Sequence, residues 1–161
     1  MANQSTWMTR SAGVLMPVSS LPSKYGIGTF GKAAREWIDF LCAAHQRFWQ
    51  VLPLGPTSFG NSPYQSYSAF AGEPLYIDLE LLCQDGLLKE KRCKRANWGS
   101  NPEKADYEAL RNERAQVLQK AFENFKKPKV LSRFRKKNAA WVEDYALFMA
   151  VKTRFDGAPW M

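Results

Sequence analysis

The sequence predicts an α/β fold that begins with a βαβ unit. Two short apolar runs, residues 11–18 and 48–54, have the length and composition of strands. Between them, apolar residues recur with the 3.6-residue period of a helix that buries one face: Ala33, Ala34, Trp37, Ile38, Leu41 and Cys42. A strand, a helix and a strand in this order predict two parallel strands joined by a right-handed crossover.

The first run is expected to be a buried strand that leaves its sheet at residues 19–23. Next, Gly26, Gly28 and Gly31 match the G-x-G-x-x-G spacing of a dinucleotide site and precede the predicted helix. These glycines lie several residues beyond the strand, however, and the next strand does not end in the acid that such a site requires. We therefore do not expect a nucleotide here.

Residues 55–72 follow the second strand and mix turn formers with four aromatic residues and many hydroxyl and amide groups. A simple connection would be shorter and would need only turn residues. Sugars present apolar C–H faces that pack on aromatic rings, and hydroxyls that both donate and accept hydrogen bonds, so this mixture suits a carbohydrate. The alternative is an aromatic loop that is buried against its own domain, and composition alone does not decide between the two.

After this loop, residues 75–79 resemble a strand fragment, and residues 80–88 a short helix that is broken near Gly86. Glu73 and Asp78 are the acids nearest to the loop. Two carboxylates could act as acid and nucleophile on a glycosidic bond, but sequence spacing does not give their separation. A surface acid and a turn-capping acid are the simpler interpretation.

In the second half of the chain, the sequence pattern predicts helices. Residues 103–125 have a helical apolar pattern that ends at Pro128. Residues 138–154 form the last predicted helix, with Asn138 as its N-cap and a buried stripe of Trp141, Val142, Tyr145, Phe148 and Met149. The turn at residues 155–161 has no element after it. We expect the strands that would cover the first two, in a second βαβ half or in the rest of a barrel, to lie beyond the chain.

The net charge of +8 belongs to the second half of the chain. Residues 1–80 carry five basic and five acidic side chains, and residues 81–161 carry eighteen and ten. Two basic runs stand out, at residues 89–95 and 126–137. A nucleic-acid surface is one interpretation, but no nucleic-acid motif accompanies the runs, and solvated helical faces are the interpretation we favour.

The composition is that of a globular chain, with 45% hydrophobic and 24% charged residues among 161. The sequence has no apolar run long enough for a transmembrane helix, and its first residues lack the pattern of a secretory signal. We therefore expect a cytoplasmic protein without a membrane partner. Cys42, Cys83 and Cys93 are odd in number, lack C-x-x-C spacing and accompany a single His, so we expect reduced thiols and no metal site.

Four blocks resemble the amino-terminal part of the 4-alpha-glucanotransferase family, the amylomaltases or disproportionating enzymes. The blocks are residues 12–22 with 25–28, residues 49–57, residues 61–72 and residues 141–152. The similarity weakens at residues 83–137. The resemblance implies that residues 1–80 hold the first two parallel strands of a (β/α)8 TIM barrel and the sugar-binding loop, and that residues 81–161 form a largely helical inserted subdomain.

The resemblance also implies transfer of an α-1,4-glucan segment to the 4-hydroxyl of an acceptor glucan or glucose, without a metal or organic cofactor. The reaction is a retaining double displacement, in which a carboxylate nucleophile forms a glycosyl-enzyme and a second acid protonates the departing oxygen. In the family a third carboxylate holds the distorted sugar, and all three acids lie on later strands. We therefore expect the catalytic residues beyond Met161 and an inactive chain on its own.

The expected partners are α-1,4-glucan oligosaccharides, and the candidate residues come from the loop. By motif position, Ser62 and Tyr64 correspond to residues that line the family's active-site subsites. Phe59 corresponds to a position where some members carry a Tyr that stacks on glucan at a second, remote groove. Asn61 and Gln65 complete the predicted substrate-binding set.

One neighbour of this set departs from the family pattern, because Glu73 stands where an Asn is common. With this departure, the sequence does not determine which local contacts the loop makes. The alternative function, from a different class, is an inactive glucan-binding or basic nucleic-acid-binding module.

Overall fold

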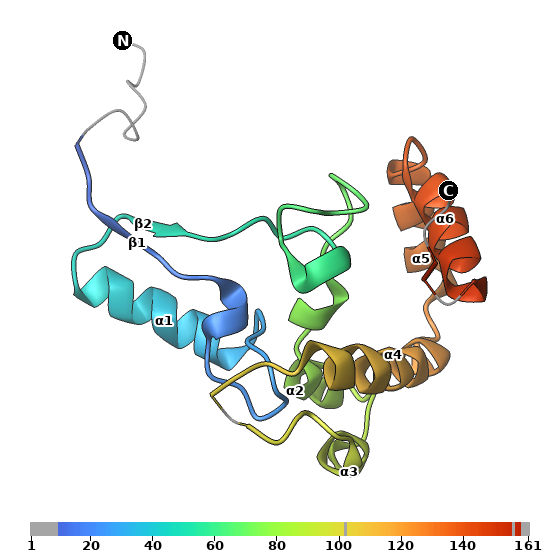
Figure 1. Cartoon of the computed structure of the whole chain (residues 1–161), viewed down its shortest axis with the longest axis horizontal. Coiled ribbons are helices and arrows are strands. Elements are labelled where there is room, and N and C mark those ends of the chain that lie inside the picture. The colour runs from blue at the N-terminus through green and yellow to red at the C-terminus, as the bar shows by residue number, and fades with distance from the viewer. Residues whose placement is uncertain (1–9, 102, 156, 159–161) are drawn as a thin grey trace.

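The computed structural model describes residues 10–101, 103–155 and 157–158, and Figure 1 shows its helices and strands. The strands are β1 (Gly13–Leu15) and β2 (Phe48–Gln50). The α-helices are α1 (Lys32–Ala43), α2 (Leu79–Gln84), α3 (Glu90–Arg95), α4 (Tyr107–Asn124), α5 (Pro128–Lys137) and α6 (Val142–Arg154). Short 3-10 helices are η2 (Val18–Ser20), η3 (Phe59–Asn61) and η4 (Pro74–Tyr76). Of the helices in the described ranges, none has the length and apolarity that crossing a membrane requires.

The predicted βαβ unit is confirmed. β1 and β2 form a parallel pair in which Val14 lies opposite Trp49, and α1 connects them. The predicted burial of the first strand is wrong, since Leu15 is 54% exposed, and Phe48 of β2 is likewise 47% exposed. The reason is the size of the sheet: in the described residues it has two strands, and a two-stranded sheet cannot cover both of its own faces.

The apolar core lies where α4 meets the loop after β1 and the helices α2 and α3 (Figure 1). One cluster contains Val18, Leu21, Ile27, Ala34, Leu75, Tyr76 and Leu110. The other contains Tyr25, Leu79, Leu88, Cys93, Val117 and Ala121. Both clusters combine residues from before and after position 80. The division of the chain into a barrel region, 1–80, and a helical subdomain, 81–161, stays a prediction.

Residues 75–79, predicted as a strand fragment, instead form the end of η4 and the start of α2. The Glu73 carboxylate accepts a hydrogen bond from the Leu75 backbone N–H (3.2 Å), and Asp78 accepts one from the N–H of Leu81 (2.8 Å). Side chains that bond to the backbone in this way favour turns and helix starts over extended strands. The short helix predicted next is confirmed as α2, which ends before Gly86.

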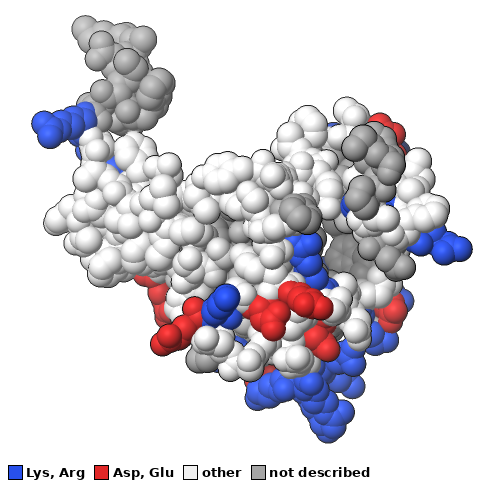
Figure 2. Space-filling view, viewed as in Figure 1, with Lys and Arg blue, Asp and Glu red and all other residues white. Residues whose placement is uncertain are grey.

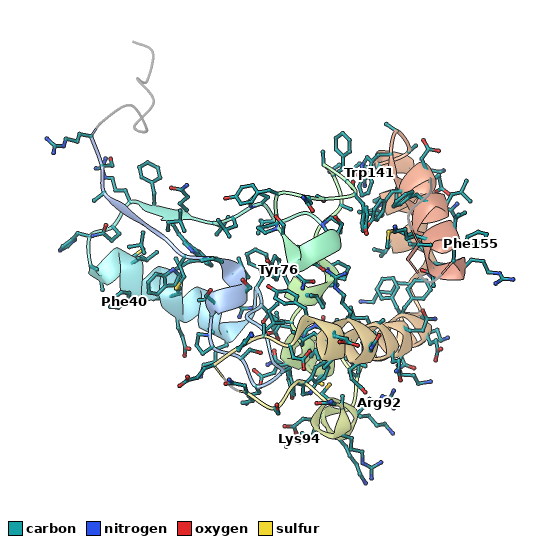
Figure 3. All side chains as sticks on the ribbon, viewed as in Figure 1. Phe40, Tyr76, Arg92, Lys94, Trp141 and Phe155 are labelled. Carbon is teal, nitrogen blue, oxygen red and sulfur yellow. The ribbon has the colours of Figure 1, made fainter. Side chains whose placement is uncertain are left out.

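The predicted helix at residues 103–125 is confirmed as α4, whose N-cap is Asp106, with its carboxylate 3.0 Å from the N–H of Ala109. Asn138 does not begin the last helix. It follows α5 as its C-cap and donates its backbone N–H to the carbonyl of Phe134 (3.0 Å). Both basic runs lie largely on helices, α3 and α5, and Arg92 and Lys94 point outward from α3 (Figure 3).

Candidate functional site

Loop 55–72 lies between the end of β2 and helix α6 (Figure 1). Thr57 and Ser66 form an isolated antiparallel bridge at its base, and the N–H of Ser58 donates to the carbonyl of Gln65 (3.1 Å). This base encloses η3 and the candidate residues. The loop is therefore an ordered structure with its own backbone hydrogen bonds.

The candidate residues share one turn of this loop. Tyr64 is 73% exposed and Gln65 is exposed, whereas Asn61 and Ser62 are half-buried. The Ser62 hydroxyl accepts a hydrogen bond from the N–H of Tyr64 (3.3 Å), and Asn61 has a positive φ of 56°. The side chain of Phe59 lies outside the part of the chain that the structure describes. Because Tyr64 is exposed, its ring is available to a ligand.

Glu73 fixes the base of the loop from below. Its carboxylate is 2.7 Å from the N–H of Thr57, 2.8 Å from the Thr57 hydroxyl and 3.2 Å from the N–H of Leu75. Only 9% of Glu73 is exposed. A carboxylate that accepts three hydrogen bonds has a structural role. Of the two roles expected for Glu73 and Asp78, a surface acid and a turn-capping acid, capping is confirmed for both, and a surface position is wrong for Glu73.

Arg111 of α4 contacts the side of the loop, a role that no sequence pattern indicated. Its Nη2 lies 2.7 Å from Asn61 Oδ1, 3.1 Å from Thr57 Oγ1 and 3.3 Å from the Ser58 carbonyl. A guanidinium presents several donors in a fixed plane, so one side chain can fix both ends of a turn. The helix α4 thus positions the candidate residues.

The aromatic stripe of α6 lies against the loop rather than in a core of its own. Tyr67 packs against Phe148, with ring centroids 5.4 Å apart, and Phe70 stacks on Trp141 at 5.9 Å. Figure 3 shows Trp141 beside the loop. The prediction of a buried stripe is wrong, because α6 has no buried residue within the described ranges. Partial burial raises the pKa of Tyr145, the next ring along the helix.

The glycine motif and the nearby acids are explained by packing. A side chain at Gly28 would collide with the Val18 carbonyl, and one at Gly31 would collide with the Asp78 carboxylate, so both glycines allow close approach within the protein. Among the described residues, no group of three His, Cys, Asp or Glu side chains could hold a metal ion.

A cavity of about 800 Å³ lies away from loop 55–72, between the loop after β1 and the segment that precedes α4. Ser19, Ser23, Trp98, Asn101 and Tyr107 are among its lining residues. The indole N–H of Trp98 already donates to the carbonyl of Cys93 (2.7 Å), and its ring is packed against Tyr25. This cavity therefore does not offer an open aromatic face of Trp98 to a sugar.

Comparison with known proteins identifies the relatives of this chain. A family model described as 4-alpha-glucanotransferase matches residues 16–161. The chain is 48% identical over 147 residues to the 4-alpha-glucanotransferase of Clostridium butyricum, covering 90% of this chain and 30% of that protein. It is 42% identical over 159 residues to the 4-alpha-glucanotransferase of Thermus thermophilus, covering 95% and 31%.

The structural comparison indicates the same family as the sequence comparison. The structure of amylomaltase from Streptococcus agalactiae in complex with acarbose matches with a TM-score of 0.88 and 45% identity, covering 93% of this chain and 31% of that one. The chain spans about 30% of the length of the curated relatives it matches. The range that the family model matches begins directly after β1 and includes β2, loop 55–72 and the helices. The chain belongs to the 4-alpha-glucanotransferase family.

Proposed function

We propose that this chain forms the glucan-binding side of an enzyme that transfers a segment of an α-1,4-glucan to the 4-hydroxyl of an acceptor glucan or glucose. The observation that carries the proposal is the family match over residues 16–161, which includes the whole of loop 55–72. The likeness to an amylomaltase solved with acarbose supports an oligosaccharide as the ligand. Three free thiols fit the reducing cytoplasm, where we expect the protein to act.

The proposed architecture is the beginning of a (β/α)8 barrel. β1 and β2 would be its first two strands, which is supported by their parallel pairing and by the exposure of Leu15 and Phe48, residues that further strands would cover. Loop 55–72 follows the carboxyl end of β2. Enzymes with this fold build their active sites from the loops at that end of the strands.

Within the loop, the contacts suggest a role for each candidate. The exposed ring of Tyr64 would stack on the apolar face of a glucose unit. Ser62 accepts from the N–H of Tyr64, which leaves its hydroxyl proton to donate to a sugar oxygen. Asn61 accepts from Arg111 through Oδ1, so its amide N–H groups would serve the sugar, and Gln65 would add a further amide. A ring at Phe59 would stack without a hydroxyl.

The bond-breaking carboxylates are proposed to lie outside residues 1–161. Near the loop, Glu73 accepts three hydrogen bonds, and Asp78 accepts from the Thr29 hydroxyl and the N–H of Leu81. A retaining mechanism needs a nucleophile and an acid about 5 Å apart across the glycosidic bond. Because Glu73 and Asp78 both serve as caps, the nucleophile and the acid would come from other segments of the enzyme. The relatives are about three times as long as this chain.

The binding role is tested with maltoheptaose and the purified chain by titration calorimetry. Tyr64→Ala should weaken binding about fivefold, because a stacked ring contributes about 1 kcal/mol. Tyr64→Phe should weaken it less, because it keeps the ring face. Phe122→Ala is the matched control, since this ring on α4 is 57% exposed and lies about 16 Å along the helix from Arg111.

Equal weakening by Tyr64→Ala and Phe122→Ala would contradict a specific site at Tyr64. The location of the catalytic acids has a separate test, in which the chain is incubated with maltotriose and glucose is measured. We expect no glucose. Glucose release by the purified chain, absent from a sample without protein, would show that residues 1–161 contain catalytic acids.

A basic nucleic-acid-binding module is the second candidate, and the surface in Figure 2 is the observation that favours it. Lys and Arg side chains gather over α3 at the lower edge of the molecule. Retention on heparin or DNA that falls steeply with salt, with none on amylose, would support this candidate. Retention on amylose that is lost in Tyr64→Ala would support the glucan site.

A further inference from the structure

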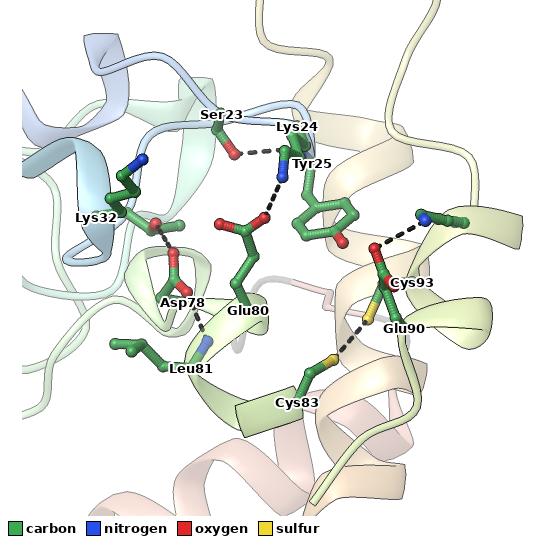
Figure 4. A network of polar contacts seen from close by, with 12 residues as sticks. Ser23, Lys24, Tyr25, Lys32, Asp78, Glu80, Leu81, Cys83, Glu90 and Cys93 are labelled. Atoms are coloured by element: carbon green, nitrogen blue, oxygen red, sulfur yellow. Dashed lines mark hydrogen bonds and ion pairs between the residues drawn. The ribbon is translucent and has the colours of Figure 1, made fainter. Parts of the chain in front are cut away.

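Two cysteines from neighbouring helices face each other in the core. Cys83 of α2 and Cys93 of α3 have their sulfur atoms 4.0 Å apart, and both are free thiols (Figure 4). A disulfide bond is about 2.05 Å long, so the two sulfurs need to approach by about 2 Å. Rotation about one Cα–Cβ bond moves a sulfur by a comparable distance, so this approach does not require a change of fold.

The two thiols differ in their surroundings. Cys93 has no exposed surface and packs in the cluster with Leu79, Leu88 and Val117, whereas Cys83 is partly exposed at the edge of that cluster. A soluble oxidant therefore reaches Cys83 first. Burial also raises the pKa of the Cys93 thiol to about 11, which keeps it protonated at neutral pH and unreactive toward an oxidant.

We infer that Cys83 and Cys93 are a redox modification site that closes to a disulfide when the protein meets a peroxide. In the first step the Cys83 thiolate attacks one oxygen of the peroxide, the O–O bond breaks, and Cys83 becomes a sulfenic acid, while the departing hydroxide takes up the proton that the Cys83 thiol released and becomes water. In the second step the Cys93 sulfur attacks the Cys83 sulfur, the S–O bond breaks, and the hydroxide leaves as water with the Cys93 proton. Two thiols and one hydrogen peroxide thus give one disulfide and two waters.

The disulfide would restrain a hinge. The segment between the helices turns at Gly86, which has a φ of 72°, and α3 ends on a hydrogen bond from the indole of Trp98 to the Cys93 carbonyl. A covalent link between α2 and α3 removes the freedom of this turn. Amide hydrogen exchange in α3 should slow about tenfold on oxidation, because local opening of that helix is then restricted.

The test uses the Cys42→Ser chain, because Cys42 is an exposed thiol on α1 that would otherwise react. The chain is treated with hydrogen peroxide, alkylated, digested with trypsin and analysed by mass spectrometry. Trypsin cuts after Lys89 and Arg92, so the two cysteines fall in separate peptides. We expect these peptides to be linked with the loss of two hydrogen atoms, and dithiothreitol to separate them.

Two variants assign the steps. In Cys83→Ser, Cys93 should stay a free thiol at the peroxide concentration that links the pair. In Cys93→Ala, Cys83 should stop at the sulfenic acid and be trapped by dimedone. If the buried substitution unfolds the chain, Cys83→Ser still decides the order of reaction, because its position is partly exposed.

Three results would overturn the inference. The first is a sulfinic Cys83 beside a free Cys93. The second is a disulfide between Cys83 residues of two chains. The third is a pair that stays reduced at a peroxide concentration that oxidises Cys42 completely in the unsubstituted chain.

Discussion

Loop 55–72 and the core beneath α4 are stabilised by different kinds of contact. The core consists of buried apolar side chains around one buried cation, Arg114, which is 1% exposed. The loop exposes Tyr64, Tyr67 and Phe70 and is fixed by polar contacts from outside, through Glu73 and Arg111. The two arginines lie one helical turn apart on α4. One helix thus supports both the fold and the candidate site, through two residues that are neighbours on its surface.

Arg114 shows how the core tolerates a charge. Its Nη2 donates to the Ile77 carbonyl (2.7 Å) and its Nη1 to the Tyr25 carbonyl (3.3 Å), and its guanidinium carbon lies 5.7 Å from the centre of the Trp98 ring. Burial lowers the pKa of Arg114 to about 10, so the group stays charged at neutral pH. Carbonyl dipoles and an aromatic face replace part of the lost hydration.

The largest predicted effect is therefore on the core. Arg114→Ala should lower the free energy of unfolding by about 3 kcal/mol, because it removes the donors to the carbonyls of Tyr25 and Ile77 and creates a cavity. Urea unfolding measures the change. Arg114→Met keeps most of the volume, so its loss should be smaller. If Arg114→Met costs as much as Arg114→Ala, the hydrogen bonds rather than the packing account for the whole effect.

A smaller effect is expected where the core and the loop meet. Glu73→Gln should lower the free energy of unfolding by about 2 kcal/mol. The carboxylate accepts hydrogen bonds from the backbone N–H groups of Thr57 and Leu75, and the NH2 group of Gln would face one of these donors and could not accept from it. The same urea experiment measures it. Thr57→Val removes the hydroxyl contacts with Glu73 and Arg111 but keeps the backbone contacts of Glu73, so it should cost less. Equal losses for the two variants would mean that the backbone contacts of Glu73 contribute little.

Alkaline pH should weaken the core by about 1 kcal/mol between pH 9 and 10. Burial raises the pKa of Cys93 from 9.0 to about 11 and that of Tyr25 from 10.0 to about 12. The unfolded chain therefore loses these protons first, and stability that is present below pH 9 is lost as the pH rises. Arg114 acts in the opposite direction, with most of its contribution above pH 10.

This pH dependence is measured by urea unfolding across the same interval. Cys93→Ala should make the slope between pH 9 and 10 shallower, although the variant is less stable at neutral pH. Cys42→Ser is the control, because that thiol is exposed. An unchanged slope in Cys93→Ala would contradict the assignment of the effect to the buried thiol.

Much of the fold could be predicted because it depends on local pattern. The 3.6-residue period of α1 and the apolar runs of β1 and β2 predicted the parallel unit, and the density of aromatic and hydroxyl groups identified loop 55–72. The errors fell where one side chain decides a boundary. Asp78 caps α2 and Asn138 follows α5, and neither role changes the hydrophobic period.

The surroundings of the site could not be predicted, because they depend on contacts between distant positions. Arg111 reaches Asn61 across fifty residues of sequence, and Phe70 stacks on Trp141. A helical stripe shows that one face of α6 is apolar, but it does not show what covers that face. For the same reason, the proximity of Cys83 and Cys93 could be found only in the structure.

The smallest effect on stability is expected from Arg111→Ala. This variant is also the sharpest test of whether loop 55–72 and the core are stabilised by different contacts. Arg111 is exposed, so its loss should change the free energy of unfolding by less than about 1 kcal/mol. The loop should nevertheless loosen, with faster amide exchange at Ser58 and a few-fold weaker affinity for maltoheptaose. Lys120→Ala removes another exposed cation of α4 and should alter neither the exchange nor the affinity.

The decisive observation is whether Arg111→Ala and Arg114→Ala affect different quantities. If the loop and the core are held independently, Arg111→Ala changes exchange in the loop and leaves the urea midpoint nearly fixed, whereas Arg114→Ala shifts the midpoint. A fall in the midpoint for Arg111→Ala as large as that for Arg114→Ala would show that loop 55–72 unfolds together with the core. In that case the polar contacts at Thr57 and Asn61 would belong to the stability of the fold and not only to the shape of the site.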